Sequence, residues 1–381
     1  MMARLGDICE VLNGYAFKSE KYTSSGVRII RIANVQKGYI EDTAPAFYPI
    51  DTTDIEKYTL YEDDLLISLT GNVGRVALLK KEFLPAALNQ RVACLRLKDS
   101  AQYDKSFLYC FLNSDYFENK CIQSAKGVAQ KNMSTKWLKE YQIPNLSLVE
   151  QKEIAAVLNK ISELISARTM QLSKMDKFVT SRFIEMFGAI SEEVPLSYYI
   201  GGLNAGKSLA GEEENPNKVL KTGAVTYDYF DETQIKNLPI DYEPQENHRV
   251  KAGDVIISRM NTAELVGAAA YVWDVPEHIY LPDRVWRAEI KETANPIFVW
   301  QVLIQSSTKE SIRRIASGTS GSMKNISKPG LLGIRVVKAP IELQLQFAVF
   351  VEQVDKSKLA IQQSLEKLET LKKALMQQYF G

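Results

Sequence analysis

Short apolar runs separated by glycine, proline and asparagine fill most of each half of the chain. The first half carries RIIRIANV at 28–35, DLLISL at 64–69 and RVACLRL at 91–97, and the second carries KVLKTGAV at 218–225, DVIISRM at 254–260 and RVWRAEI at 284–290. Apolar or alternating runs bounded by turn-forming residues predict β-strands. These parts of the chain are therefore predicted to be β-rich domains of the α+β class.

Two long stretches instead show the three- and four-residue spacing of an amphipathic helix. The first follows Pro144, begins with the capping-box pattern of Ser147 and Glu150, and stops at Gly188; the second runs from Pro340 to Gly381. Each helix would contain about 38 residues and be roughly 57 Å long, which exceeds what one globular domain covers. The apolar face of each helix therefore needs a second long partner.

The simplest partner for each long helix is the equivalent helix of the other half, which predicts an intramolecular antiparallel coiled coil. Two alternatives are that each helix packs on its own domain or that it drives formation of a dimer. The residues expected in the helix–helix seam are Ile161, Leu172, Met175, Val354, Ile361, Leu365 and Leu368.

The chain also repeats itself at a nearly constant spacing. Gln151 and Gln344, Lys131-Asn132 and Lys324-Asn325, and Gly188 and Gly381 are 193 residues apart, whereas EDDLLIS at 62–68 matches AGDVIIS 190 residues later. Repeats this long indicate two tandem domains and not a solenoid. The predicted architecture is a pseudo-twofold tandem repeat with β-rich domains at 1–145 and 189–338 and long helices at 146–188 and 339–381.

The string GGLNAGKS at 201–208 fits the phosphate-loop pattern, with Lys207 and Ser208 in the required places. That pattern binds phosphate only where a helix follows the loop. Gly211, Pro216 and three consecutive glutamates interrupt the next two turns. We therefore expect a polar surface loop, and the repeat aligns it with AFKS at 16–19, so that Lys207 corresponds to Lys18.

Composition narrows the possible chemistry. Lysine and arginine total 47 against 46 acidic residues, so any surface for nucleic acid must come from uneven placement of charge. The four cysteines form no CxxC pair, which is typical of buried thiols in a reduced, cytoplasmic protein. His248 and His278 are the only histidines and lack neighbours at metal-ligand spacing. No apolar run approaches the roughly 18 residues of a membrane span, so we expect a soluble protein.

The opening RLGDICEVLNGYAFKSEKY, the junction IPNLSLVEQKEIAAVL and its counterpart APIELQLQFAVFVEQVD resemble the specificity subunits of type I restriction-modification systems. The resemblance covers the whole chain. It implies that each β-rich domain is a target recognition domain that reads one half of a split site in double-stranded DNA. It further implies that the long helices set the spacing and dock two modification (methyltransferase) subunits, joined by restriction subunits. S-adenosylmethionine, ATP and magnesium would belong to those partners, and no cofactor to this chain.

Two catalytic patterns are only partly present. The string NPIF at 295–298 lacks the second proline of an adenine-methylase motif, and no glycine-rich cofactor loop precedes it. Pro282-Asp283 followed by Glu289 and Lys291 imitates a nuclease metal site. Along one strand the two carboxylates would stand about 20 Å apart, too far to share a cation. The chain is therefore predicted to have no catalytic site.

Polar loop residues are the candidates for DNA contact, because lysine and arginine meet phosphates while arginine, asparagine and lysine can also read base edges. For the first half they are Lys18, Arg31, Asn72, Arg75, Lys126, Lys131 and Asn132, and for the second half Lys207, Lys221, Arg259, Asn261, Lys324 and Asn325. Arg91 and Arg284 are interpreted as residues that simply start a strand. A rival hypothesis is a coiled-coil scaffold that binds proteins and has no DNA specificity.

Overall fold

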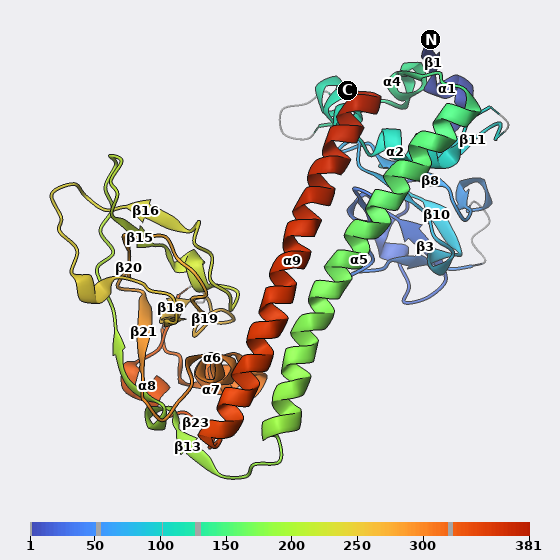
Figure 1. The fold of residues 1–381 in the computed structure, drawn as a ribbon. Coiled ribbons are helices and arrows are strands. Elements are labelled where there is room, and N and C mark those ends of the chain that lie inside the picture. The colour runs from blue at the N-terminus through green and yellow to red at the C-terminus, as the bar shows by residue number, and fades with distance from the viewer. Residues whose placement is uncertain (1, 51–54, 101, 126–130, 319–322) are drawn as a thin grey trace. The chain divides into compact units, whose positions relative to one another are not determined.

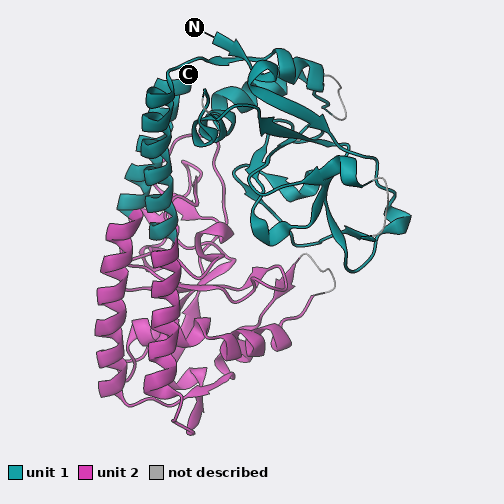
Figure 2. Cartoon of the chain, turned by 90° about the vertical axis from the view of Figure 1, so that its right-hand side faces the viewer, with its two compact units in different colours: residues 1–169, 363–381 teal, residues 170–362 magenta. Residues whose placement is uncertain are grey.

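A computed structural model describes residues 2–50, 55–100, 102–125, 131–318 and 323–381. The chain divides into two compact units (Figure 2). Unit 1 comprises residues 1–169 and 363–381, and unit 2 comprises residues 170–362. Lys126 therefore lies outside the described residues. Each unit combines β-sheets with helices, so the fold is α+β.

The strands and short helices of unit 1 lie between residues 2 and 144. Its strands are β1 (Met2–Arg4), β2 (Cys9–Asn13), β3 (Val27–Ile30), β4 (Val35–Gln36), β5 (Tyr39–Ile40), β6 (Phe47–Tyr48), β7 (Thr59–Leu60), β8 (Leu65–Ser68), β9 (Val76–Leu78), β10 (Ala86–Leu88), β11 (Val92–Leu97) and β12 (Gln142–Pro144). Its short helices are α1 (Leu5–Ile8), α2 (Lys105–Leu112), α3 (Asp115–Ser124) and α4 (Thr135–Glu140).

Unit 2 follows a similar plan. Its strands are β13 (Glu193–Pro195), β14 (Ile200–Asn204), β15 (Lys218–Leu220), β16 (Ile235–Asn237), β17 (Val255–Ser258), β18 (Met260–Asn261), β19 (Ala269–Tyr271), β20 (Ile279–Tyr280), β21 (Val285–Ile290), β22 (Lys324–Asn325) and β23 (Arg335–Val337). Its short helices are α6 (Pro296–Ile304), α7 (Ser306–Ile315) and α8 (Lys328–Leu332).

The main sheet has corresponding strands in the same order in both units. The order is β2-β11-β8-β9 in unit 1 and β14-β21-β17-β19 in unit 2, and all neighbours are antiparallel. The register also agrees, since Ser68 pairs with Val92 and Ser258 with Val285. A second sheet has the order β6-β3-β10-β7 in unit 1 and β16-β15-β20 in unit 2.

The central strands β8 and β17 are buried on both faces because each lies between two hydrophobic clusters. Alternate residues of a strand point to opposite faces. In β8, Leu65 and Ile67 join the cluster that includes α2 and α3, while Leu66 joins the cluster of the second sheet. Burial of both faces explains why these strands read as continuous apolar runs in the sequence.

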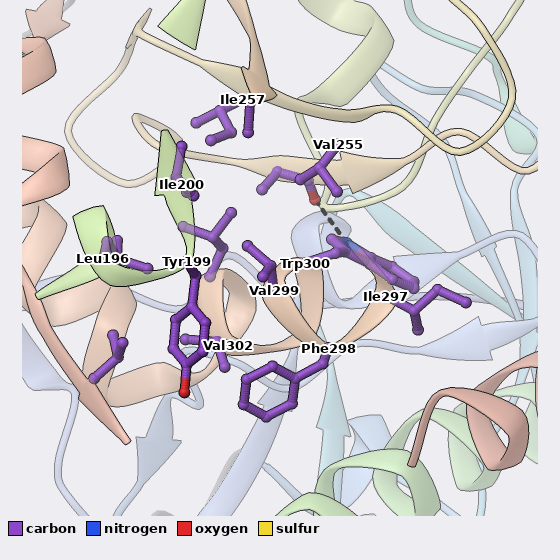
Figure 3. Close-up of a cluster of buried hydrophobic side chains, with 14 of the residues drawn as sticks. Leu196, Tyr199, Ile200, Val255, Ile257, Ile297, Phe298, Val299, Trp300 and Val302 are labelled. Atoms are coloured by element: carbon purple, nitrogen blue, oxygen red, sulfur yellow. Dashed lines mark hydrogen bonds between the residues drawn. The ribbon is translucent and has the colours of Figure 1, made fainter. Parts of the chain in front are cut away.

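The largest cluster of unit 2 packs α6 against the main sheet (Figure 3). Phe298 and Val299 are fully buried beside Tyr199 and Val255. The indole of Trp300 donates a hydrogen bond of 3.0 Å to the carbonyl of Ala269, shown as a dashed line. The core therefore satisfies the polar atom of this large aromatic residue while burying its ring.

Two helices of 40 residues each, α5 (Leu148–Phe187) and α9 (Ile341–Phe380), are the longest elements (Figure 1). The predicted capping box of α5 is confirmed. The Ser147 N–H donates to the carboxylate of Glu150 at 2.9 Å, and the Glu150 N–H donates to the Ser147 hydroxyl oxygen at 3.3 Å. The Ser147 hydroxyl also donates to the Glu150 carboxylate at 2.7 Å, and this bond, together with the one from the Ser147 N–H, lowers the pKa of Glu150.

Each unit contains the start of one long helix and the end of the other. In unit 2, the ring of Phe178 lies 5.1 Å from that of Phe350, and Phe183 lies 5.5 Å from Phe347. The residue number rises in α5 as it falls in α9, so these segments run antiparallel. In unit 1 the end of α9 packs on the domain, with Phe380 5.4 Å from Phe111.

The residues predicted for the seam lie on partly or fully covered faces of the two helices. Ile161, Val354 and Ile361 are buried, and Leu172, Met175, Leu365 and Leu368 are half-buried. Among the described residues, no helix combines the length and apolar character needed to cross a membrane.

Candidate nucleic-acid interface

Two polar loops of unit 1, which are distant in sequence, form one surface feature. Thr70 and Asn132 form an antiparallel β-bridge. Beside it, the Gly71 N–H donates to the carbonyl of Lys131 at 2.9 Å, and the Met133 N–H donates to the carbonyl of Leu69 at 2.8 Å. We call residues 70–75 and 131–132 the unit 1 loop pair. It brings together Asn72, Arg75, Lys131 and Asn132, which the sequence placed in two separate loops.

Unit 2 builds the corresponding feature with two short strands. In the β18–β22 ladder, Met260 pairs with Asn325 and Asn261 pairs with Lys324. Residues 259–262 and 324–325 are called the unit 2 loop pair. Met260 and Asn325 stand where Thr70 and Asn132 stand in the repeat, so the register of the two loop pairs is the same.

The unit 1 loop pair carries exposed polar side chains on a backbone that local contacts hold in place. The side chains of Asn72, Lys131 and Asn132 are exposed. The guanidinium of Arg75 donates to the side-chain oxygen of Gln36. The loop turns sharply at Gly71 and Gly74, whose φ angles are 69° and 84°, a region that favours glycine. The exposed amide and ammonium groups are therefore carried on a well-defined backbone.

The side chains of the unit 2 loop pair are more strongly engaged with their own domain. The guanidinium carbon of Arg259 lies 5.6 Å from the centre of the Trp286 ring, and its Nε is 3.4 Å from Oδ1 of Asn325. The ammonium of Lys324 donates to the carbonyl of Gly318 at 2.8 Å. Equivalent backbone positions thus present different patterns of donors and acceptors in the two units.

Exposed arginines lie next to both loop pairs and were not among the predicted contacts. The carbonyl of Arg91 accepts from the N–H of Leu69, and that of Arg284 accepts from the N–H of Arg259, both at 3.0 Å. Both arginines are exposed and directly precede β11 and β21. Each does start a strand, but it also adjoins the loop pair. The match of Arg91 to Arg284 in the repeat was the available sequence signal.

The other predicted contacts lie elsewhere in their units. Lys18 and Lys221 are exposed, each before a 3-10 helix. Lys207 is also exposed, with its ammonium 5.7 Å from the centre of the Tyr242 ring. Arg31 is half-buried and donates to the carbonyl of Ala44. Contacts within the protein therefore hold the guanidinium of Arg31.

The string GGLNAGKS does not form the predicted surface loop over its whole length. Residues 201–204 belong to β14, which pairs with β21, and no helix follows before β15. Ser208 instead hydrogen-bonds through its hydroxyl to the carboxylate of Asp283. A strand in this position lacks the geometry of a phosphate loop.

The nuclease-like residues have other partners. Glu289 accepts from the side-chain amide of Asn204, and the ammonium of Lys291 donates to the carbonyl of Ser197 at 2.7 Å. Within the described ranges, no group of three or more histidine, cysteine, aspartate or glutamate side chains could hold a metal ion.

One family model matches the first part of the chain. Residues 1–174 match the family described as the type I restriction modification DNA specificity domain. The EcoAI specificity subunit of Escherichia coli is 39% identical over 168 residues, which cover 42% of this chain and 28% of that protein. Over these residues the chain is similar to type I restriction enzyme specificity subunits.

Other relatives extend this finding. The MjaVIII specificity subunit of Methanocaldococcus jannaschii is 30% identical over 183 residues, covering 46% of this chain and 42% of that protein. These matches span less than half the length of either relative. The crystal structure of a type I restriction-modification S subunit from M. genitalium superposes with a TM-score of 0.63 at 17% identity, covering 100% of this chain and 96% of that one. This likeness shows a shared fold.

Proposed function

We propose that the chain is a non-catalytic subunit that reads the two halves of a split site in double-stranded DNA. The observation that carries this proposal is the loop pair present in the same register in both units. The proposal includes target recognition domains at 1–145 and 189–338. The helices at 146–188 and 339–381 would form an antiparallel coiled coil in a pseudo-twofold molecule.

The chemistry of the loop pairs suits DNA. An asparagine amide can both donate to and accept from an adenine edge, and lysine or arginine can bind guanine or a phosphate. We assign base reading to Asn72, Lys131 and Asn132 in unit 1 and to Asn261, Lys324 and Asn325 in unit 2. Arg75, Arg91, Arg259 and Arg284 would hold the adjacent phosphates. Lys18, Lys207 and Lys221 are candidates for more distant phosphate contacts, as is the Lys126 predicted from sequence.

The partners follow from the kind of protein to which the chain is related. We infer that two modification subunits dock on the chain and supply S-adenosylmethionine chemistry, and that restriction subunits add ATP- and magnesium-dependent steps. The protein would act in the cytoplasm, where the DNA lies. The chain itself would supply recognition and spacing.

Salt dependence of duplex binding tests the proposal. The site is first identified by mapping methylation in cells that co-express the chain with its modification subunit. Binding of that complex to a duplex containing the site is then measured between 50 and 200 mM salt. If about six phosphates are neutralised, affinity should fall on the order of a thousandfold. A coiled-coil scaffold without DNA specificity would bind the duplex and a scrambled control equally weakly.

A further inference from the structure

Each unit carries a tight turn after a 3-10 helix, at Ile32–Asn34 in unit 1 and Thr222–Val225 in unit 2. We call residues 36–39 and 226–229 the aromatic turns. At the tip of each turn one residue has a positive φ angle, 89° at Gly38 and 64° at Asp228. The backbone closes in the same way, because the N–H of residue 41 donates to the carbonyl of residue 34 at 2.8 Å, and residue 231 to residue 224 at 2.9 Å.

Both turns present tyrosine rings to solvent. Tyr39 is 57% exposed and Tyr229 is 55% exposed, and they occupy matching places directly after the positive-φ residue. In unit 2, Tyr227 is 69% exposed and its ring is stacked on that of Tyr229, with centroids 6.5 Å apart. Large aromatic side chains exposed at the same place in two diverged domains suggest a contact surface.

Ion pairs link each turn to a nearby helix, and the turn supplies the cation in unit 1 but the anion in unit 2. In unit 1, the ammonium of Lys37 binds Asp115 at 2.6 Å and Glu118 at 2.7 Å, both on α3. In unit 2 the turn supplies the acid, and Asp228 binds Lys309 of α7, which is only 8% exposed. Different charged residues thus link the same turn to a helix in each unit, next to the tyrosine that the turn carries.

The aromatic turns adjoin the loop pairs. Gln36 of the unit 1 turn accepts the hydrogen bond from Arg75. In unit 2, a pocket lined by Asp228, Glu264 and Arg313 adjoins a second pocket lined by Glu264, Arg313 and Lys324. Each turn is therefore continuous with the surface assigned to DNA in its own unit.

We propose that Tyr39 and Tyr229 each place an aromatic ring against a sugar or base edge of the duplex beside the half-site, and that Tyr227 widens this contact in unit 2. The inference rests on the proposed function, and it adds a contact that does not depend on hydrogen bonding. Because every nucleotide of the duplex offers the same apolar surface on its sugar, burial of the rings contributes affinity and leaves the choice of bases to the loop pairs.

The test compares Tyr39→Ser and Tyr229→Ser with Tyr39→Phe and Tyr229→Phe in the complex with the modification subunit. A fluorescent duplex containing the mapped site serves as the probe. Tyr61→Ser is the matched control, because Tyr61 is 58% exposed but precedes β8, at the opposite end of that strand from the unit 1 loop pair.

Each serine variant should bind the duplex about fivefold more weakly because less apolar area is buried, while the phenylalanine variants and the control should bind like the wild type. The methylated sequence should not change. Wild-type binding by the serine variants would overturn the inference, as would equal loss in the phenylalanine variants. Unchanged duplex binding together with weaker capture of the modification subunit would also overturn it, because the rings would then contact protein. Absence of site-specific binding by the wild-type complex would instead contradict the proposed function.

Discussion

At the scale of single residues, equivalent positions have acquired different neighbours in the two units. Asn132 has its side-chain oxygen 3.4 Å from the hydroxyl of Thr70, whereas that of Asn325 lies 3.4 Å from Nε of Arg259. The backbone bridge is shared, but the groups around each asparagine differ. Under the proposed function, this combination would let one scaffold read two unlike half-sites, because base recognition depends on the donors and acceptors presented.

The four thiols offer a residue-scale prediction. All four cysteines are free and buried, and burial raises the pKa of Cys9 to about 12 and that of Cys110 to about 11. The pKa values of Cys94 and Cys121 are raised for the same reason. Since the thiolate is the reactive form, an aromatic disulfide reagent at pH 8 should label the native chain far more slowly than the unfolded chain. Rapid labelling of any thiol in the native chain would contradict this packing.

Part of the site could be predicted from residue types and part could not. The matching of Lys131-Asn132 to Lys324-Asn325 identified one loop of each pair. Which loops meet could not be derived, because the bridge from Thr70 to Asn132 joins residues far apart in sequence and depends on the whole domain. The exposed position of Arg91 beside this bridge could not be derived either, because it also depends on the tertiary structure of the domain.

At the scale of elements, a buried glutamine in the first turn of each long helix links that helix to its domain. The side-chain oxygen of Gln151 accepts from the N–H of Asp104, and that of Gln344 accepts from the N–H of Asn295, both at 2.9 Å. Asp104 and Asn295 are themselves the N-caps of α2 and α6. One side chain therefore ties together the starts of two helices.

Replacing either glutamine by alanine should lower the free energy of unfolding by about 1 to 3 kcal/mol, because a buried N–H loses its acceptor. The control is Gln353→Ala, at an exposed position within α9. Urea unfolding followed by circular dichroism gives the comparison. If Gln151→Ala and Gln344→Ala were no less stable than the control, these hydrogen bonds would not anchor the helices.

Elements with a strong local pattern were the most predictable. The periodicity and capping residues of α5 indicated a helix of nearly the observed length. The string at 201–208 was predicted as a loop, yet residues 201–204 form a strand. The two glycines of this strand, Gly201 and Gly202, give no alternation of apolar side chains. The strand conformation comes from pairing with β21.

At the scale of the whole molecule, the length of the proposed coiled coil would set the number of base pairs between the two half-sites. Adding one heptad to each long helix would lengthen the rod by about 10 Å at 1.5 Å per residue, or roughly three base pairs. Methylation mapping of this double insertion should return the same half-sites with a longer spacer. A folded, active variant with its original spacer would show that the helices do not measure the DNA.

The central claim is that each unit reads its own half-site, and one comparison tests it most directly. The double variants Lys131→Ala/Asn132→Ala and Lys324→Ala/Asn325→Ala are each co-expressed with the modification subunit, and the methylated sites are mapped. Each variant should relax or lose one half-site only, at a cost of about 1 to 3 kcal/mol for each base contact removed. Equal weakening of both half-sites by either variant would contradict the claim, because the loop pairs would then bind phosphates without reading sequence.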